Sequence, residues 1–324
     1  MPNNTSIIDS IISEIKQNRF ISIFFHELPD GDALGAAFGF SAYIKFMFPD
    51  KDIRIVGIEQ VDRSNLKDIF TNLSERLPTD DDFISSSLAI VLDTANKDRI
   101  FSKKAHLAKK VIKIDHHANS EAYGAINWIE PTASSTCEMI IDLICHYNLD
   151  GLTRKVAFYL YTGLITDSGR YLHPSTTAHT FEAARILMDT GFNWTLLHEN
   201  LYTKSLNEKK LEIYLSKKIV YDTNNQIAHL IIPKGIHKRF NVPNACSMIY
   251  LLSDVKEMNA WISIYYDEEL KVWKGSIRSR RFDVATVASK YNGGGHKLAA
   301  GFKLTKISDF HKIITDLILA VKTK

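Results

Sequence analysis

Hydrophobic residues in the first half of the chain alternate between short continuous runs and stretches with helical spacing. The runs are apolar nearly throughout, which is typical of strands buried on both faces of a sheet, and they predict strands at 20–25, 52–57, 88–92 and 111–114. Helical spacing predicts helices at 33–48, 135–147, 154–162 and 177–189. Strands and helices in this order indicate an α/β domain with a doubly wound parallel sheet.

The second half of the chain has a different order of elements. A long helix rich in Lys and Glu, without a turn signal before residue 222, is predicted at 194–221. Strands at 227–232, 260–266 and 272–277, a helix at 284–291, a glycine-rich turn, a further strand and a terminal helix follow. We therefore expect a larger N-terminal domain at 1–192, a helical linker at 193–222 and a smaller α/β domain at 223–324.

The N-terminal segment and the composition indicate a cytoplasmic protein. Ile8, Ile11, Ile12 and Ile15 predict an amphipathic helix, and the segment lacks the features of a signal peptide. No apolar run approaches the roughly 18 residues that a membrane-spanning helix needs. With 45% hydrophobic and 24% charged residues among 324, the chain has the composition of a globular protein with two domains.

Net charge and cysteine content exclude some classes of protein. A formal net charge of +3 is too small for a protein that binds duplex nucleic acid stably, because such a protein presents a strongly basic face. Cys137, Cys145 and Cys246 form neither a CxxC pair nor an even disulfide framework, and we interpret them as buried core thiols. An anionic ligand must therefore be bound by a local cluster of residues.

Acidic and imidazole side chains follow three of the predicted strands. They are, in chain order, His26, Asp30, Asp32, Asp93, Asp115, His116 and His117. Because ligands of an open α/β sheet bind at the carboxyl ends of its strands, we expect these side chains at one edge. A further carboxylate, Asp167, lies in the segment TGLITDSG, whose glycines let the backbone approach another group closely.

Each of these residues has an ordinary structural alternative, since Asp and His are common in turns and Asp30 by itself is a good helix cap. The set as a whole favours a metal site, because mixtures of imidazole and carboxylate bind Mn, Fe or Co. Thiolate ligands, which are typical of structural zinc, are missing from it. Two divalent ions about 3.5 to 4 Å apart can clamp a phosphate and activate a water. Asp93, at the end of the central strand, is the natural bridging ligand.

The segments HELPDGD, LDTAN, DHH and TGLITDSG, in this order, resemble the four N-terminal motifs of the DHH phosphoesterase superfamily. The downstream segments SIRS, GGGH and AAG resemble the associated DHHA1 domain. The resemblance implies that one metal is bound by His26, Asp30 and Asp93. It implies that the other metal is bound by Asp32, Asp93, His116 and Asp167. His117 would then face the substrate phosphate, and Asp115 would support the histidines.

The downstream motifs indicate a substrate site in the second domain. Successive backbone N–H groups of a glycine run can bind an anionic oxygen, and the planar guanidinium of Arg278 suits a phosphate. Taken alone, the segment could equally be a glycine-rich hairpin with surface arginines. With the DHHA1 resemblance, the expected substrate residues are Arg278, Ser279, Gly293, Gly294, Gly295 and His296. Among the residues that act on the phosphoryl group we expect Asp115, His117 and Arg278.

The resemblance implies a phosphoesterase with its active site in the cleft between a DHH domain and a DHHA1 domain. Its substrates would be short oligoribonucleotides, cleaved to mononucleotides, or 3'-phosphoadenosine 5'-phosphate (pAp), converted to AMP by a water that two metal ions activate. Mn2+ is the expected metal, with Mg2+ or Co2+ as alternatives. The motifs do not separate this activity from cleavage of linear or cyclic diadenylate. A non-catalytic nucleotide-binding or RNA-binding module is the alternative of another class. A homodimer is compatible with the sequence, which does not determine the oligomeric state.

Overall fold

The computed structural model describes residues 5–58, 66, 69–70, 79–242 and 247–322. Cys246, one of the three cysteines interpreted as core thiols, lies outside these residues, whereas Cys137 is buried and Cys145 is partly buried. The chain divides into two compact units, Met1–Thr203 and Lys204–Lys324. This division falls inside the segment predicted to be a linker. No helix in the part of the chain that the structure describes is long and apolar enough to cross a membrane.

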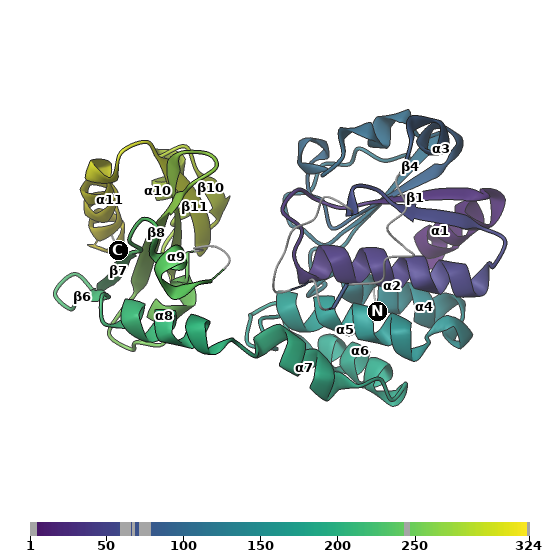
Figure 1. Ribbon diagram of the computed structural model, residues 1–324. Helices are drawn as coiled ribbons and strands as arrows, with labels where there is room; N and C mark the ends of the chain where they lie inside the picture. The colour runs from purple at the N-terminus through teal and green to yellow at the C-terminus, as the bar shows by residue number, and fades with distance from the viewer. Residues whose placement is uncertain (1–4, 59–65, 67–68, 71–78, 243–246, 323–324) are drawn as a thin grey trace. The chain divides into compact units, whose positions relative to one another are not determined.

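The first unit is built on a parallel sheet of five strands (Figure 1). Along the sheet the order is β2-β1-β3-β4-β5. The bounds are β1 (Phe20–Phe24), β2 (Asp52–Ile55), β3 (Leu88–Leu92), β4 (Lys110–Asp115) and β5 (Ile126–Ile129). The predicted parallel sheet is therefore confirmed. The fifth strand was not predicted, because four residues at the sheet edge, of which only Trp128 is buried, give no clear periodicity.

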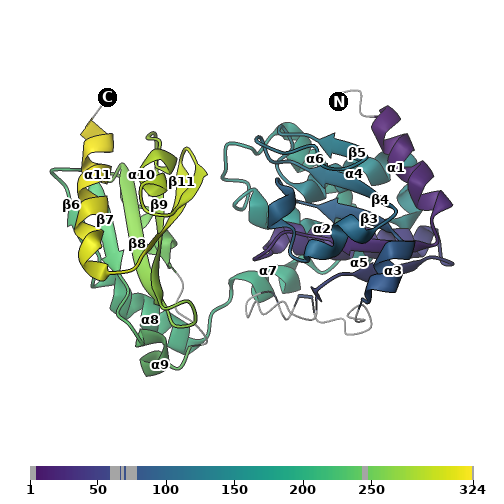
Figure 2. The same ribbon diagram turned by 90° about the horizontal axis from the view of Figure 1, so that it is seen from above.

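Helices cover the two faces of this sheet unequally, as Figures 1 and 2 show. One face packs on a large core to which the long helices contribute, and the other on a small core with residues from α3 and a 3-10 helix. The α-helices are α1 (Thr5–Gln17), α2 (Gly31–Met47), α3 (Asp81–Ser86), α4 (Thr136–Tyr147), α5 (Arg154–Asp167), α6 (Ala178–Asp189) and α7 (Trp194–Tyr202). Short 3-10 helices lie at Lys97–Arg99, Lys103–Leu107 and Leu149–Gly151. The four isoleucines predicted to form one face of α1 are all buried.

The packing of α2 against α5 depends on glycine. A Cβ at Gly35 would lie 2.6 Å from the carbonyl oxygen of Tyr159. A Cβ at Gly163 would lie 2.3 Å from Cys137 Sγ and 2.6 Å from Asp32 Oδ1. Side chains at these positions would separate the helices. The packing also carries α5 five residues beyond the predicted helix 154–162, to Asp167.

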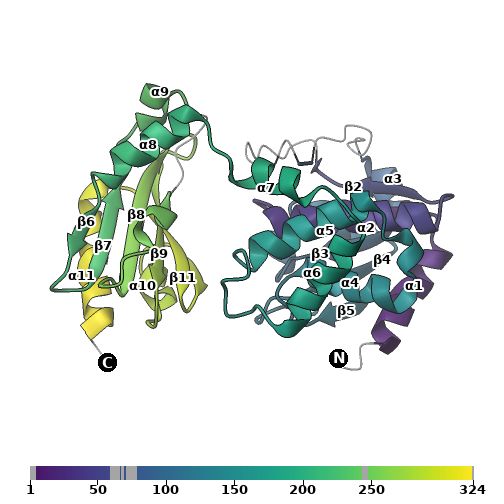
Figure 3. The ribbon, with the colours of Figure 1, turned by 90° about the horizontal axis from the view of Figure 1, so that it is seen from below.

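The second unit contains a mixed sheet of six strands in the order β10-β11-β9-β8-β7-β6. The strands from β11 to β6 can be followed in Figure 3. Only β7 and β8 pair in parallel among the described strands of this sheet. The bounds are β6 (Val220–Asp222), β7 (Ile227–Ile231), β8 (Ala260–Asp267), β9 (Val272–Ser279), β10 (Gly294–His296) and β11 (Ala299–Leu304). One core includes residues of α10 (Ala285–Ser289) and α11 (Phe310–Lys322), and another includes residues of α8 (Leu206–Ser216) and α9 (Ile236–Phe240). Further 3-10 helices lie at Ile249–Leu252 and Ile307–Asp309.

The segment predicted to be one long helix at 194–221 instead forms α7, α8 and the start of β6. Ser205 begins α8, because its hydroxyl accepts from the backbone N–H of Glu208 while the Glu208 side chain accepts from the backbone N–H of Ser205. This reciprocal capping starts a new helix after the non-helical residues that follow α7.

A buried carboxylate on α8, that of Glu212, accepts hydrogen bonds from Lys204, Lys209 and Tyr250. Burial raises the pKa of Glu212, but these bonds outweigh it and lower the pKa to about 2. Glu212 therefore ties α8 to the 3-10 helix that contains Tyr250.

Candidate metal centre

The carboxyl ends of β1, β3 and β4 bring the predicted site residues to one edge of the parallel sheet. The chain leaves β1 into His26 and then caps α2 with Asp30, whose Oδ1 accepts from the backbone N–H groups of Asp32 and Ala33. Asp93 follows β3 directly, and Asp115 is the last residue of β4. Asp30 therefore does cap a helix, which was the structural alternative to a metal-binding role. The same oxygen lies 3.8 Å from His26 Nε2.

Three groups of side chains place their ligand atoms within 4.8 Å of one another. The first consists of His26, Asp30 and Asp93, the second of Asp32, His116 and Asp167, and the third of Asp93, His116 and His117. Asp93 Oδ2 lies 3.3 Å from His26 Nε2, and Asp93 Oδ1 lies 3.5 Å from His116 Nε2. Each oxygen of this one carboxylate therefore faces a different group, as a bridging ligand would.

The backbone of Asp93 has an unusual conformation for a residue with a side chain. Its φ is 51°, in the left-handed region, and its side chain is buried. The backbone N–H donates to Ile114 O on the neighbouring strand, and Thr136 Oγ1 donates to Asp93 Oδ1 at 3.2 Å. Backbone strain of this kind is typical of functional sites, where the surrounding structure maintains it.

The imidazoles of His26 and His116 are oriented by backbone carbonyls. His26 Nδ1 lies 2.8 Å from Glu27 O, and His116 Nδ1 lies 3.3 Å from Ala133 O. A carbonyl only accepts, so the Nδ1 atoms carry hydrogen and the Nε2 atoms face the carboxylates. His116 Nε2 is 3.3 Å from Asp167 Oδ2, at the end of α5. This tautomer offers Nε2 to a cation.

Asp32 is held by the N-terminus of α4, a contact between segments more than 100 residues apart. The N–H of Thr136 donates to Asp32 Oδ2 at 2.7 Å, and the N–H of Cys137 donates to Asp32 Oδ1 at 3.0 Å. These are first-turn groups of a helix that Ser135 caps. Each carboxylate oxygen has a second lone pair, which remains for a cation.

The charges of these residues call for a positive partner. Burial lowers the pKa of His26, but Asp30 and Asp93 outweigh it and raise the pKa to about 11. Burial likewise lowers the pKa of His116, which Asp93 and its neighbouring carboxylates raise to about 9. Burial, followed by the charge of Asp93, raises the pKa of Asp32 to about 7. Four carboxylates and two imidazoles of this geometry fit divalent cations, which would replace the protons on Nε2.

A second layer of polar residues lies beneath this site. His117 Nδ1 donates to Asp115 Oδ1 at 2.8 Å, and Ser120 Oγ donates to Asp115 Oδ2. The ammonium of Lys113, on β4, is fully buried and lies 3.5 Å from Asp115 Oδ2. It also donates to the carbonyl oxygens of Ala95 and Glu121, each at 2.7 Å. Asp115 therefore orients His117, as expected, and Lys113 connects Asp115 to the loops around it.

The predicted substrate residues of the second unit meet at one end of its sheet. Arg278 on β9 pairs with Ala299 on β11, and Ala299 pairs with His296 on β10, so these positions lie side by side. The glycine-rich segment is thus an edge strand rather than the predicted turn. It can lie close to β11 because a Cβ at Gly293 would be 2.1 Å from Gly301 O. The hydroxyl of Ser279 donates to Phe282 O, which engages it within its own turn.

Comparison with known proteins gives the family. A model of the DHH family, N-terminal domain, matches residues 20–164, and a model of the DHHA1 domain matches residues 224–323. The bifunctional oligoribonuclease and PAP phosphatase NrnA of Bacillus subtilis is 32% identical over 297 residues, which are 90% of this chain and 91% of that protein. This chain belongs to the DHH family.

Two further proteins show how far the DHH-family likeness extends. The uncharacterized protein MG371 of Mycoplasma genitalium is 37% identical over 307 residues, 95% of this chain and 93% of that protein. The crystal structure of an exopolyphosphatase-related protein from Bacteroides fragilis has a TM-score of 0.87 at 22% identity, and the match covers 97% of this chain and 96% of that one. The expected two-domain α/β fold is confirmed, and family membership supports a metal-dependent phosphoesterase.

The structure adds two residues to the DHH-family site that sequence reasoning missed. Thr136 contacts both Asp32 and Asp93, and its signal in the sequence is the Ser-Thr pair that begins α4. Lys113 is a charged residue inside the otherwise apolar run VIKI, which should have marked it as buried with a partner. All six predicted metal ligands lie in the first two groups described above.

Proposed function

We propose that this chain hydrolyses phosphate esters of short nucleotides, cleaving short oligoribonucleotides to mononucleotides and pAp to AMP. The observation that carries the proposal is the position of Asp93, whose two carboxylate oxygens face two separate groups of ligand atoms. The names of the NrnA relatives support the choice of substrates. Their identity to this chain extends over most of both proteins.

The proposed metal ligands are divided by these groups. His26, Asp30 and Asp93 would hold one divalent ion, and the other would be held by Asp32, Asp93, His116 and Asp167. We propose Mn2+, with Mg2+ or Co2+ as alternatives, because the donors are imidazoles and carboxylates. When bound, a pair of divalent ions supplies Lewis acidity toward the phosphoryl group and lowers the pKa of water.

His117 is proposed to contact the substrate rather than a metal. Its Nδ1 donates to Asp115 Oδ1 at 2.8 Å and lies 3.6 Å from Asp93 Oδ1, which places the ring beside the proposed metal ligands. Burial raises the pKa of Asp115, but bonds from His117 and Ser120 and the charge of Lys113 outweigh it and lower the pKa. An ionised Asp115 holds the His117 ring in place, and we propose that the ring contacts the phosphoryl group.

The nucleotide part of the substrate is assigned to the second unit. Arg278 offers a planar guanidinium, and the backbone of Gly293, Gly294 and Gly295 together with His296 lies two strands away from it. We propose that residues 1–192 form the metal-binding domain, residues 193–222 the linker and residues 223–324 the substrate-binding domain. The proposed role of Ser279 in substrate binding has the least support, because its hydroxyl already donates to Phe282 O.

A parallel assay tests the proposal. Purified protein with Mn2+ is offered a dinucleotide, a tetranucleotide, pAp, cyclic diadenylate and pyrophosphate. Release of mononucleotide or AMP is expected from the short RNAs and pAp. Product from pyrophosphate alone contradicts the substrate assignment, and preference for cyclic diadenylate replaces it with the diadenylate alternative. A folded, metal-loaded protein that is inactive on every compound is a binding module instead.

Two variants separate the metal site from the substrate site. Asp93→Ala should abolish turnover because both proposed metals lose a ligand, whereas Asp98→Ala, an exposed neighbour, should not. Arg278→Ala should chiefly raise KM, and Arg281→Ala, which alters an exposed arginine nearby, is its matched control. Near-normal turnover of Asp93→Ala would contradict the two-metal arrangement.

A further inference from the structure

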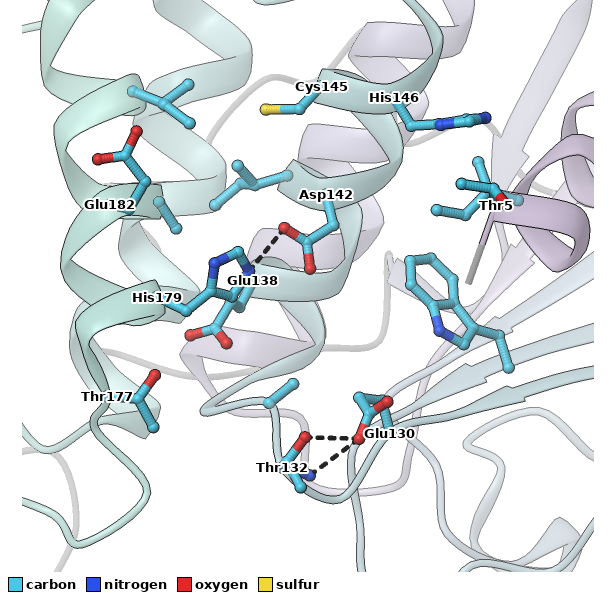
Figure 4. A pocket seen from close by; sticks show the side chains of 16 residues that line it. Thr5, Glu130, Thr132, Glu138, Asp142, Cys145, His146, Thr177, His179 and Glu182 are labelled. Carbon is cyan, nitrogen blue, oxygen red and sulfur yellow. Dashed lines mark hydrogen bonds and ion pairs between the residues drawn. The ribbon is translucent and has the colours of Figure 1, made fainter. Parts of the chain in front are cut away.

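A cavity of about 530 Å³ lies in the first unit, between α1, α4, α6 and the end of β5. Side chains of α4 and α6 face each other across it (Figure 4). Its volume is that of a small-molecule site, and its walls include Ile8, Ile141, Ala183 and Ile186. Neither the metal ligands nor the proposed substrate residues line it, so the proposed phosphoesterase activity does not account for it.

The charged side chains that line this cavity are acidic apart from two histidines, His146 and His179. Among the described residues that line it, four are carboxylates and none is Lys or Arg. The carboxylates are Glu130, Glu138, Asp142 and Glu182. Arg185 pairs with Glu182 at 2.8 Å, and the other three carboxylates disfavour a nucleotide or another phosphate here. These charges favour a neutral or cationic ligand.

Two polar groups in the cavity wall point to the chemistry of the ligand. Asp142 Oδ1 accepts from His179 Nε2 at 2.8 Å, and burial raises the pKa of Asp142 despite this partner. Trp128 is 2% exposed, and its indole N–H has no hydrogen-bond partner among the described residues. A buried donor without a partner is unfavourable, and a ligand that accepts from it would remove that cost.

The cavity is joined to the metal centre by one short segment, residues 130–136. Ala133 lines the cavity while its carbonyl accepts from His116 Nδ1. At the end of the segment, Thr136 donates to Asp32 and Asp93. Glu130, which also lines the cavity, donates its backbone N–H to Asp115 O. A ligand that shifts this segment therefore shifts contacts of three proposed metal ligands.

We propose that this cavity is a regulatory site for a small organic cation, an amine with an aromatic or branched apolar body and a hydrogen-bond acceptor. The ammonium pairs with Asp142, the acceptor receives the Trp128 N–H, and the body fills the apolar part. Its effect on turnover rests on the proposed phosphoesterase function, whereas its binding does not.

Isothermal titration calorimetry of the full chain with three related probes tests the binding. Tyramine carries the ring, an acceptor and the ammonium; phenethylamine lacks the acceptor; 3-(4-hydroxyphenyl)propionate has a carboxylate in place of the ammonium. Tyramine should bind about fivefold more tightly than phenethylamine, the value of one neutral hydrogen bond. The carboxylate probe should not bind. Equal binding of tyramine and the carboxylate probe, or no binding of tyramine, overturns the site.

Variants assign the two contacts. Asp142→Asn keeps the shape of the side chain and should weaken tyramine binding by about tenfold or more, since it removes a charge-assisted bond. Asp150→Asn, the same change at an exposed position outside the cavity, should have no effect. Trp128→Phe should remove the difference between tyramine and phenethylamine. An unchanged affinity in Asp142→Asn contradicts the proposed ion pair.

Hydrolysis of a dinucleotide with and without saturating tyramine tests the regulatory role. Turnover should change by about threefold or more, within the usual range of coupling between sites, and Asp142→Asn should lose this response at the same tyramine concentration. Binding without any change in turnover would overturn the regulatory role. A chain that binds tyramine but hydrolyses none of the nucleotides would contradict the proposed function and not the cation site.

Discussion

Replacing the buried ammonium of Lys113 gives the sharpest test of how the site is supported. Lys113→Met keeps most of the side-chain volume and removes the charge. In the structure this ammonium donates to Ala95 O and Glu121 O, contacts Asp115, and lies 4.3 Å from the ring centroid of Tyr123. The substitution leaves the carboxylate of Asp115, which is also fully buried, without its cation.

The expected cost follows from these contacts. Removal of one partner of a buried ion pair costs about 3–5 kcal/mol, because the remaining charge is uncompensated. For a unit of this size each kcal/mol lowers Tm by roughly 2–4 °C, so Lys113→Met should lower the Tm of the first unit by on the order of 10 °C. Turnover should fall as well, since Asp115 orients His117.

Differential scanning calorimetry of the full chain measures the loss. Lys110→Met is the matched control, because Lys110 is on the same strand but its ammonium pairs with Glu14 at a half-exposed position. It should cost about 1 kcal/mol or less. The double variant Lys113→Met/Asp115→Asn should recover part of the lost stability, since no unpaired charge remains. If Lys113→Met unfolds within a degree or two of Lys110→Met, the buried ammonium does not support the site.

Three further predictions concern a close helix contact, acid stability and the metals. Gly163→Ala should destabilise the chain by about 1–3 kcal/mol or more and weaken metal binding, as measured by urea denaturation and by calorimetric titration with Mn2+. Gly301→Ala, where the added Cβ would meet nothing closer than 3.7 Å, is its control. The pKa of Glu212 is about 2 in the folded chain against 4.5 unfolded, so its contribution is present above pH 4.5 and is lost as pH falls toward 2. Glu212→Gln should therefore be less stable than the original chain near neutral pH, with a difference that shrinks in acid; a difference that grows in acid would contradict the assignment. Chelation should lower the Tm of the first unit, and added Mn2+ should restore it. At a free Mn2+ concentration of one hundred times Kd, the metal should stabilise the folded state by about 2.7 kcal/mol. A Tm that changes with neither addition would argue against metal binding at this edge.

Much of the first unit could be predicted from local patterns. The bounds of β3 were predicted without error, because Leu88–Leu92 is a continuous apolar run that begins after polar serines and ends at Asp93. The position of the proposed metal ligands of β1, β3 and β4 followed, since a parallel sheet brings its strand ends to one edge. The sequence analysis expected the glycines of TGLITDSG to allow a close approach, and Gly163 does so: a Cβ there would lie 2.3 Å from Cys137 Sγ and 2.6 Å from Asp32 Oδ1.

The errors arose where distant contacts decide local structure. Gly163 has low helix propensity, so the predicted helix stopped short of it, whereas packing on α2 continues the helix. The glycines at 293–295 were predicted to form a turn, but pairing with β11 places Gly294 and Gly295 in a strand. The start of α8 could have been found from Ser205 and Glu208, a capping pair three residues apart. The contact of Thr136 with Asp32 joins positions 104 residues apart, which no local pattern reveals.

The contact of Gly163 with Asp32 limits which substitutions this protein can accept during evolution. Asp32 on α2 and Asp167 on α5 are proposed ligands of the same metal. At Gly163 the backbone of α5 packs directly against Asp32, with no side chain of α5 between them. The spacing of the donor atoms is therefore set by the main chain. Mutations elsewhere in the hydrophobic core can be absorbed by repacking without moving these donors, while even one added methyl group at this contact alters their separation. We expect substrate preference in such a scaffold to diversify through the second unit and the surface loops, with the metal centre constant in geometry.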